Sequence, residues 1–183
     1  MSKYERCDQS VQDLANAILC KYDDHKPILD AKVRIDYLFA FPEKDDDGNY
    51  VGDAIRHHGV KALGLTRKIP TKERAAGLGD AEVLLDGEWW ADETTTDEQR
   101  AALLDHELHH LEVVKDEDGL VCLDNNDRPR LKLRMHSFEV GWFKEIAERH
   151  GAASQECIQA KMLWESSGQA YFPALFGEHP VAA

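Results

Sequence analysis

The sequence predicts a single α+β domain. Three patterns carry this prediction: apolar residues recur at helical spacing over residues 11–19, alternate with polar residues over 31–41, and return to helical spacing over 103–114. A chain of 183 residues can bury a hydrophobic core of its own. We expect one domain over residues 1–183, with its core at about 11–151 and a C-terminal helix and tail at 152–183.

The first half of the chain should form one helix and three strands. The helix is expected to start at Ser10, a residue type that caps helix N-termini, and to end near Tyr22. The first strand covers residues 31–41 and stops before Pro42. The other strands are expected at 60–69 and 80–90.

Two tryptophans, Trp89 and Trp90, end the third predicted strand. Large aromatic rings bury much apolar area, so packing against the sheet or the next helix is the expected role of both. A place in the wall of a substrate cleft is the alternative.

The central helix has its own start signal and a buried face. Thr95, with Glu98 three residues later, is expected to form a capping box. Leu104, Leu108 and Leu111 fall on one face of the helix. After it, we expect a small hairpin with arms at 120–123 and 130–134, a helix over about 136–149, and a last helix from about residue 154.

Charge and cysteine usage exclude several classes of protein. The formal net charge of −13 argues against broad contact with nucleic-acid phosphates. The four cysteines are scattered without a CxxC pair, which suits reduced thiols better than a disulfide framework. The N-terminus has no basic patch followed by an apolar stretch, and no run approaches membrane-spanning length. We therefore expect a cytoplasmic protein that binds neither nucleic acid nor membrane; its oligomeric state stays open.

The central helix contains an HExxH motif, His106-Glu107-Leu108-His109-His110. On a helix, His106 and His110 project about 40° apart on one face, so both imidazoles can bind one zinc ion. Glu107 projects beside them, where a water on the metal would lie. His109 is expected to pack or to support a ligand rather than to be one.

A catalytic zinc takes three protein ligands and keeps one open position. Because one helix face cannot enclose a tetrahedron, the third ligand should come from another element. His136 is the first choice, and Glu139, one turn later, is the alternative. With Zn²⁺ bound, a water would lose its proton to Glu107, which would act as general base on a peptide bond.

The order of elements, the HExxH helix and the later His136-Ser137-Phe138-Glu139 resemble the small zincin-type metallopeptidases found in phage and prophage genomes and, more distantly, the SprT-like minimal zincins. The resemblance covers about residues 11–151. In that family an acidic residue often follows the downstream ligand position, where this chain has Ser137. The resemblance implies a minimal zincin-like α+β fold, with a small sheet packed against the HExxH helix, a hairpin and further C-terminal helices.

We predict a zinc-dependent metallopeptidase that acts on a protein or peptide substrate. Two alternatives remain open. One is a regulatory protease that cuts a single intracellular partner, and the other is a non-catalytic zinc-binding interaction protein. A structural zinc site would not require Glu107, which argues against the second alternative.

Overall fold

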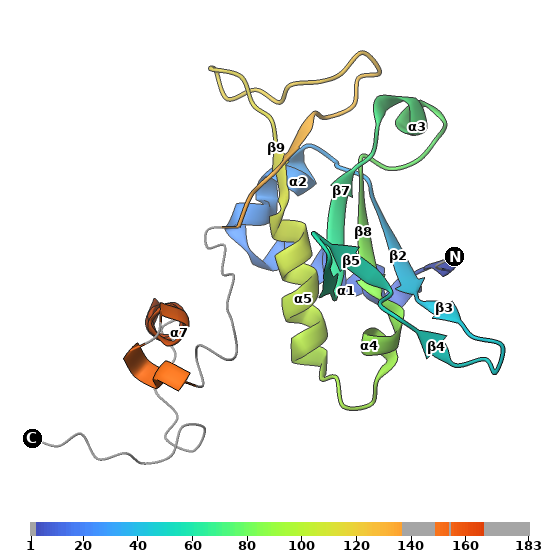
Figure 1. Ribbon diagram of the computed structural model, residues 1–183. Coiled ribbons are helices and arrows are strands. Elements are labelled where there is room, and N and C mark those ends of the chain that lie inside the picture. Colours follow the sequence, from blue (N-terminus) through green and yellow to red (C-terminus); the bar gives the residue numbers. More distant parts are fainter. Residues whose placement is uncertain (1–2, 137–148, 154, 167–183) are drawn as a thin grey trace, which may run out of the picture. The chain divides into compact units, whose positions relative to one another are not determined.

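The computed structural model describes residues 3–136, 149–153 and 155–166 (Figure 1). The chain divides into two compact units, Met1–Met135 and His136–Ala183. The described elements of the second unit are η2 (Gly151–Ala153) and α7 (Gln155–Ser166). The helix predicted over about 136–149 lies almost entirely outside the described residues.

A four-stranded mixed sheet with the order β1-β2-β8-β7 organises the first unit. β2 and β8 run parallel, and the outer strands β1 and β7 pair antiparallel with them. The strands are β1 (Lys3–Arg6), β2 (Ile35–Phe41), β7 (Gly64–Lys68) and β8 (Ala81–Asp86). Every residue of β8 is buried, as expected for a central strand covered on both faces.

One face of the sheet is covered by helices, and Figure 1 shows α5 lying alongside β7 and β8. The larger apolar core joins residues of α1, α2, β8, α5 and the hairpin that follows. Leu85, Leu104 and Leu108 lie at its centre and are fully buried. The helices are α1 (Gln9–Lys21), η1 (Asp23–His25), α2 (Lys26–Asp30), α3 (Thr71–Ala75), α4 (Gly87–Ala91) and α5 (Asp97–His109).

The other face of the sheet has a smaller apolar cluster. Leu84 of β8 and Ala40 of β2 pack there against Ala54 and Ile55. Ile55 belongs to the hairpin of β5 (Ile55–His57) and β6 (Val60–Ala62). A second two-stranded ribbon, β3 (Glu43–Lys44) with β4 (Tyr50–Val51), precedes it.

The α+β class is confirmed, and several predicted boundaries are wrong. Asp8, not Ser10, caps α1, because its carboxylate accepts from the backbone N–H of Ser10 and of Val11. The strand predicted over 60–69 is two strands, since β6 folds back on β5 before β7 joins the sheet.

Trp89 and Trp90 lie on α4 and not in the predicted strand. Asp86 ends β8 and caps the new helix by accepting from the N–H of Glu88 and of Trp89. Trp90 packs against the main core, with its ring centroid 5.9 Å from that of Phe39. The expected packing role is therefore confirmed for Trp90.

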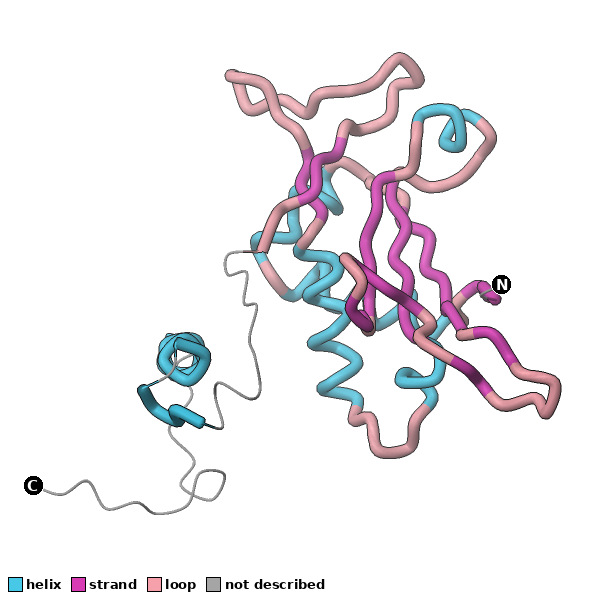
Figure 2. The backbone as a smooth tube through the Cα atoms, in the orientation of Figure 1, coloured by secondary structure: helices cyan, strands magenta, loops and turns pink. Residues whose placement is uncertain are grey.

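The hairpin after α5 is present, but its first arm is formed by other residues than those predicted. The first arm is β9 (Leu111–Val113), directly after α5, and the second is β10 (Leu131–Leu133). Leu111 and Val113 are buried with a polar residue between them, so this segment fits a strand with one buried face better than a continued helix. Figure 2 shows the intervening residues as a long loop beyond the end of α5.

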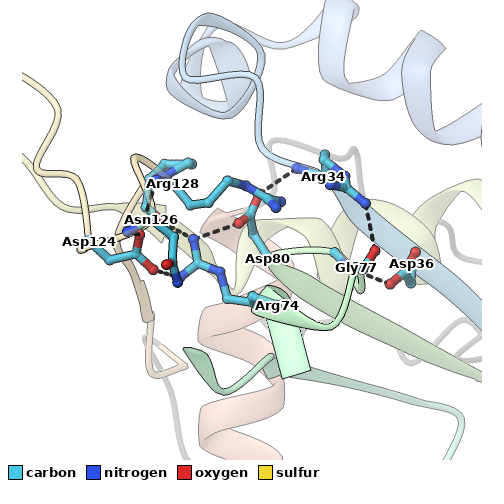
Figure 3. A network of polar contacts seen from close by, with 10 residues as sticks. Arg34, Asp36, Arg74, Gly77, Asp80, Asp124, Asn126 and Arg128 are labelled. Atoms are coloured by element: carbon cyan, nitrogen blue, oxygen red, sulfur yellow. Dashed lines mark hydrogen bonds and ion pairs between the residues drawn. The ribbon is translucent and has the colours of Figure 1, made fainter. Parts of the chain in front are cut away.

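A buried network of charges anchors that loop to the turn between β7 and β8 (Figure 3). Arg74 pairs with Asp80 at 2.7 Å and with Asp124 at 3.1 Å, and its guanidinium also donates to the carbonyl of Pro129. Asp80 pairs with Arg128 as well and accepts from the backbone N–H of Arg34. Because a buried charge is costly unless it is paired, these contacts hold the long loop in one position.

No helix among the described residues combines the length and the apolar character needed to cross a membrane.

Candidate functional site

The helix α5 is capped at one end and buried along one side, and this leaves a polar side available. Thr96 and Gln99 form the capping box, one residue later than the predicted pair Thr95 and Glu98. The hydroxyl of Thr95 is used elsewhere, because it donates to the carbonyl of Trp89. Leu104 and Leu108 are buried in the core as predicted.

His106 and His110 share one side of α5, with ring centroids 5.0 Å apart. The helix ends earlier than predicted, at His109, but His110 keeps helical backbone angles as its C-cap. The two rings therefore keep the i, i+4 spacing of a helix, although α5 ends earlier than predicted.

A carbonyl on the neighbouring strand segment orients His110. Its Nδ1 lies 2.9 Å from the carbonyl oxygen of Arg134, and because a carbonyl only accepts, Nδ1 carries the proton. The backbone N–H of Arg134 donates to the carbonyl of His110 at 2.7 Å. With Nδ1 occupied in this way, Nε2 is the nitrogen suited to a metal.

His136 directly follows the chain segment that orients His110. One ligand atom from each of His106, His110 and His136 lies within 4.8 Å of the other two. Glu139, the alternative third ligand, lies outside the described residues. Three imidazoles at this spacing form a donor set that zinc commonly takes.

The carboxylate of Glu107 points away from solvent, with 3% of the residue exposed. The hydroxyl of Thr66, on β7, lies 2.8 Å from its Oε2 and 2.9 Å from its backbone carbonyl. Burial raises the pKa of Glu107 above its usual value, while the Thr66 hydrogen bond and the nearby His110 both act to lower it. The edge strand therefore fixes this carboxylate and moderates its acidity.

Gly64, at the start of β7, lets the strand approach Glu107 closely. A Cβ at this position would collide with the Glu107 carboxylate. Neither Gly64 nor Thr66 was singled out from the sequence as a site residue. A glycine inside a strand pattern is a signal of close approach, but the sequence does not say which residue approaches.

The other polar residues around the motif contact different partners. Asp105 lies 2.6 Å from Nε2 of His25, and Glu112 pairs with Lys132 on the facing strand. His109 lies on the side of α5 that faces η1, where its Nδ1 is 3.2 Å from Asp24. The support for His110 is a backbone carbonyl that the sequence could not identify.

Replacing Thr66 by valine should destabilise the metal-free protein by about 1–3 kcal/mol at neutral pH, because the buried Oε2 of Glu107 loses its donor. The hydrogen bond lowers the pKa of Glu107, so its loss raises the folded-state pKa further above the unfolded value. The stability deficit should therefore be largest at pH values above that pKa and shrink as the pH falls through it. Urea denaturation in the presence of a chelator at several pH values measures this.

Thr66→Ser is the matched control, because it keeps the hydroxyl and should recover most of the loss. A Thr66→Val deficit that is equal at all pH values, or that serine fails to recover, would show that Thr66 stabilises only by packing.

Residues 2–165 match a family model described as "Putative phage metallopeptidase". No curated protein and no solved structure matches the chain. The match covers most of the sequence, including the HExxH motif and His136. The chain therefore belongs to the putative phage metallopeptidase family, whose name implies a bound metal ion.

Proposed function

We propose that the protein is a zinc-dependent metallopeptidase of the zincin type. The observation that carries the proposal is the arrangement on α5, where two histidines share one side and the intervening Glu107 is buried and held by Thr66. A surface helix with chance histidines would not need a buried, oriented glutamate. The membership of the family supports the peptidase class.

The residues present fit a zinc ion. His106, His110 and His136 would hold it, since their ligand atoms group within 4.8 Å and nitrogen donors suit this metal. The carbonyl of Arg134 accepts the Nδ1 proton of His110 and so favours the tautomer that a metal ligand needs. A set of three protein ligands would leave one position for water and substrate.

Zinc, when bound, acts as a Lewis acid that polarises a peptide carbonyl and makes water more acidic. Glu107 takes the proton of the attacking water and passes it to the departing amine, as general base and then general acid. Thr66 holds the carboxylate in position during both transfers. Because burial raises the pKa of Glu107, the group is a stronger base than an exposed glutamate.

Glu107→Gln should lower peptidase activity by at least about 100-fold and leave zinc content unchanged, because glutamine keeps the size of the side chain but cannot accept the proton. Cleavage of casein, with zinc measured by elemental analysis of protein purified without chelator, tests both parts. Glu98→Gln, an exposed acid in the first turn of α5, is the control and should behave as wild type.

A Glu107→Gln variant that cleaves as fast as wild type would contradict the proposed role of Glu107. A wild type that binds zinc but cleaves neither casein nor a peptide library would favour the non-catalytic zinc-binding alternative. Cleavage of a single intracellular protein, with casein left intact, would favour the regulatory protease.

His136→Ala should reduce the affinity for zinc by at least 10-fold, whereas Glu139→Ala should leave it close to that of wild type. The reason is that we assign His136, whose ligand atom lies with those of His106 and His110, as the third ligand. Competition with a chromogenic chelator measures both affinities. A larger loss of zinc affinity in Glu139→Ala than in His136→Ala would assign Glu139 as the third ligand. The site would then consist of two histidines and a glutamate.

A further inference from the structure

Three side chains form a second group of possible metal ligands. It lies on a different side of α5 from His106 and His110. One ligand atom from each of Asp24, His25 and His109 lies within 4.8 Å of the other two. Asp24 and His25 belong to η1, and His109 is the last residue of α5. The group therefore lies where η1 meets the C-terminal end of the helix.

The ligand spacing suits a small divalent cation. Nδ1 of His109 and Oδ2 of Asp24 are 3.2 Å apart. Two ligands at about 2.0–2.1 Å from a tetrahedral zinc lie about 3.3 Å from each other. A cation could thus be bound by both atoms with little movement of either side chain.

His25 is oriented in the way that metal-binding histidines usually are. The residue is 2% exposed, and its Nε2 lies 2.6 Å from Oδ1 of Asp105 on α5. When that carboxylate accepts the Nε2 proton, Nδ1 has the lone pair that a metal requires. A carboxylate behind a histidine both fixes its tautomer and makes it a better ligand.

Arg134 competes with a cation for His109. Its guanidinium Nη1 lies 2.6 Å from Nε2 of His109. Because a guanidinium only donates, Nε2 must accept, so the proton of the neutral ring lies on Nδ1 and faces Asp24. A cation on Nδ1 would move that proton to Nε2, where it would meet the N–H of Arg134, so the guanidinium would have to swing away.

We propose that Asp24, His25 and His109 form a second divalent-cation site, selective for metals that accept imidazole and carboxylate ligands, such as Zn²⁺. Arg134 occupies His109 when the site is empty and leaves when it fills. A bound cation would link η1 to the end of α5. The acidic balance of the chain, with a net charge of −13, favours cation binding over anion binding. The proposal does not depend on the proposed peptidase activity.

The test uses the full chain with His106→Ala and His110→Ala, which removes two ligands of the first cluster. Zinc titration by calorimetry and the shift of the melting temperature with zinc report the second site, because a ligand that binds only the folded state raises its stability. We expect one zinc per chain and a rise in melting temperature. Adding Asp24→Asn should weaken binding at least 10-fold.

Asp23→Asn is the matched control, because Asp23 is an exposed neighbour that pairs with Lys26 and is not part of the group. Arg134→Met should tighten zinc binding, since the competing guanidinium is gone. Equal zinc affinity in the Asp24→Asn and Asp23→Asn variants, or no zinc binding in either, would contradict the proposed second site. Unchanged or weaker zinc binding in Arg134→Met would contradict the proposed competition between the Arg134 guanidinium and a cation for His109.

Should the double alanine variant fail to fold, judged by circular dichroism, zinc stoichiometry in the otherwise unaltered chain decides the question. The Asp23→Asn variant should then bind one zinc more per chain than the Asp24→Asn variant. Equal stoichiometry would overturn the proposal.

Discussion

The contact between Thr66 and Glu107 is the constraint on which the candidate site depends. It joins the edge strand β7 to the HExxH helix α5 at the one acidic residue that lies inside the motif. The absence of a side chain at Gly64 allows the strand and the helix to come this close. A carboxylate buried without a donor would be costly, so the strand stabilises the glutamate while keeping it away from bulk water.

The features that could be predicted from sequence are those encoded locally. The alternation around Ile35–Phe41 and the leucines of α5 identified a strand and a helix, because period and burial are linked within one element. The pairing of His106 with His110 also follows from helix geometry alone. The choice between Thr95 and Thr96 as cap could not be made, because the Thr95 hydroxyl donates to the backbone carbonyl of Trp89, which lies on a helix where a strand was predicted.

The rest of the site depends on contacts between residues far apart in the sequence. Thr66 meets Glu107 across 41 positions and His25 meets Asp105 across 80, so neither pair leaves a local pattern. The early end of α5 has the same origin, because Leu111 and Val113 are buried by pairing with Leu133 and Leu131. The single-domain prediction and the zincin-type ligand set stay predictions.

Arg134 contacts both histidine groups, the one that contains His110 and the one that contains His109. Its backbone forms hydrogen bonds with His110, while its side chain lies against Nε2 of the adjacent His109. The backbone contacts do not depend on where the guanidinium lies. The two histidine groups have separate supporting acceptors, the carbonyl of Arg134 for His110 and the carboxylate of Asp105 for His25.

Anomalous diffraction at the zinc edge, on crystals grown from protein purified without chelator, would locate a zinc ion relative to the HExxH helix. We expect a peak about 2.0–2.1 Å from a ring nitrogen of His106 and of His110, beside the carboxylate of Glu107. A zinc peak elsewhere with none at this pair, or imidazoles that point apart in the zinc-loaded crystal, would contradict this expectation.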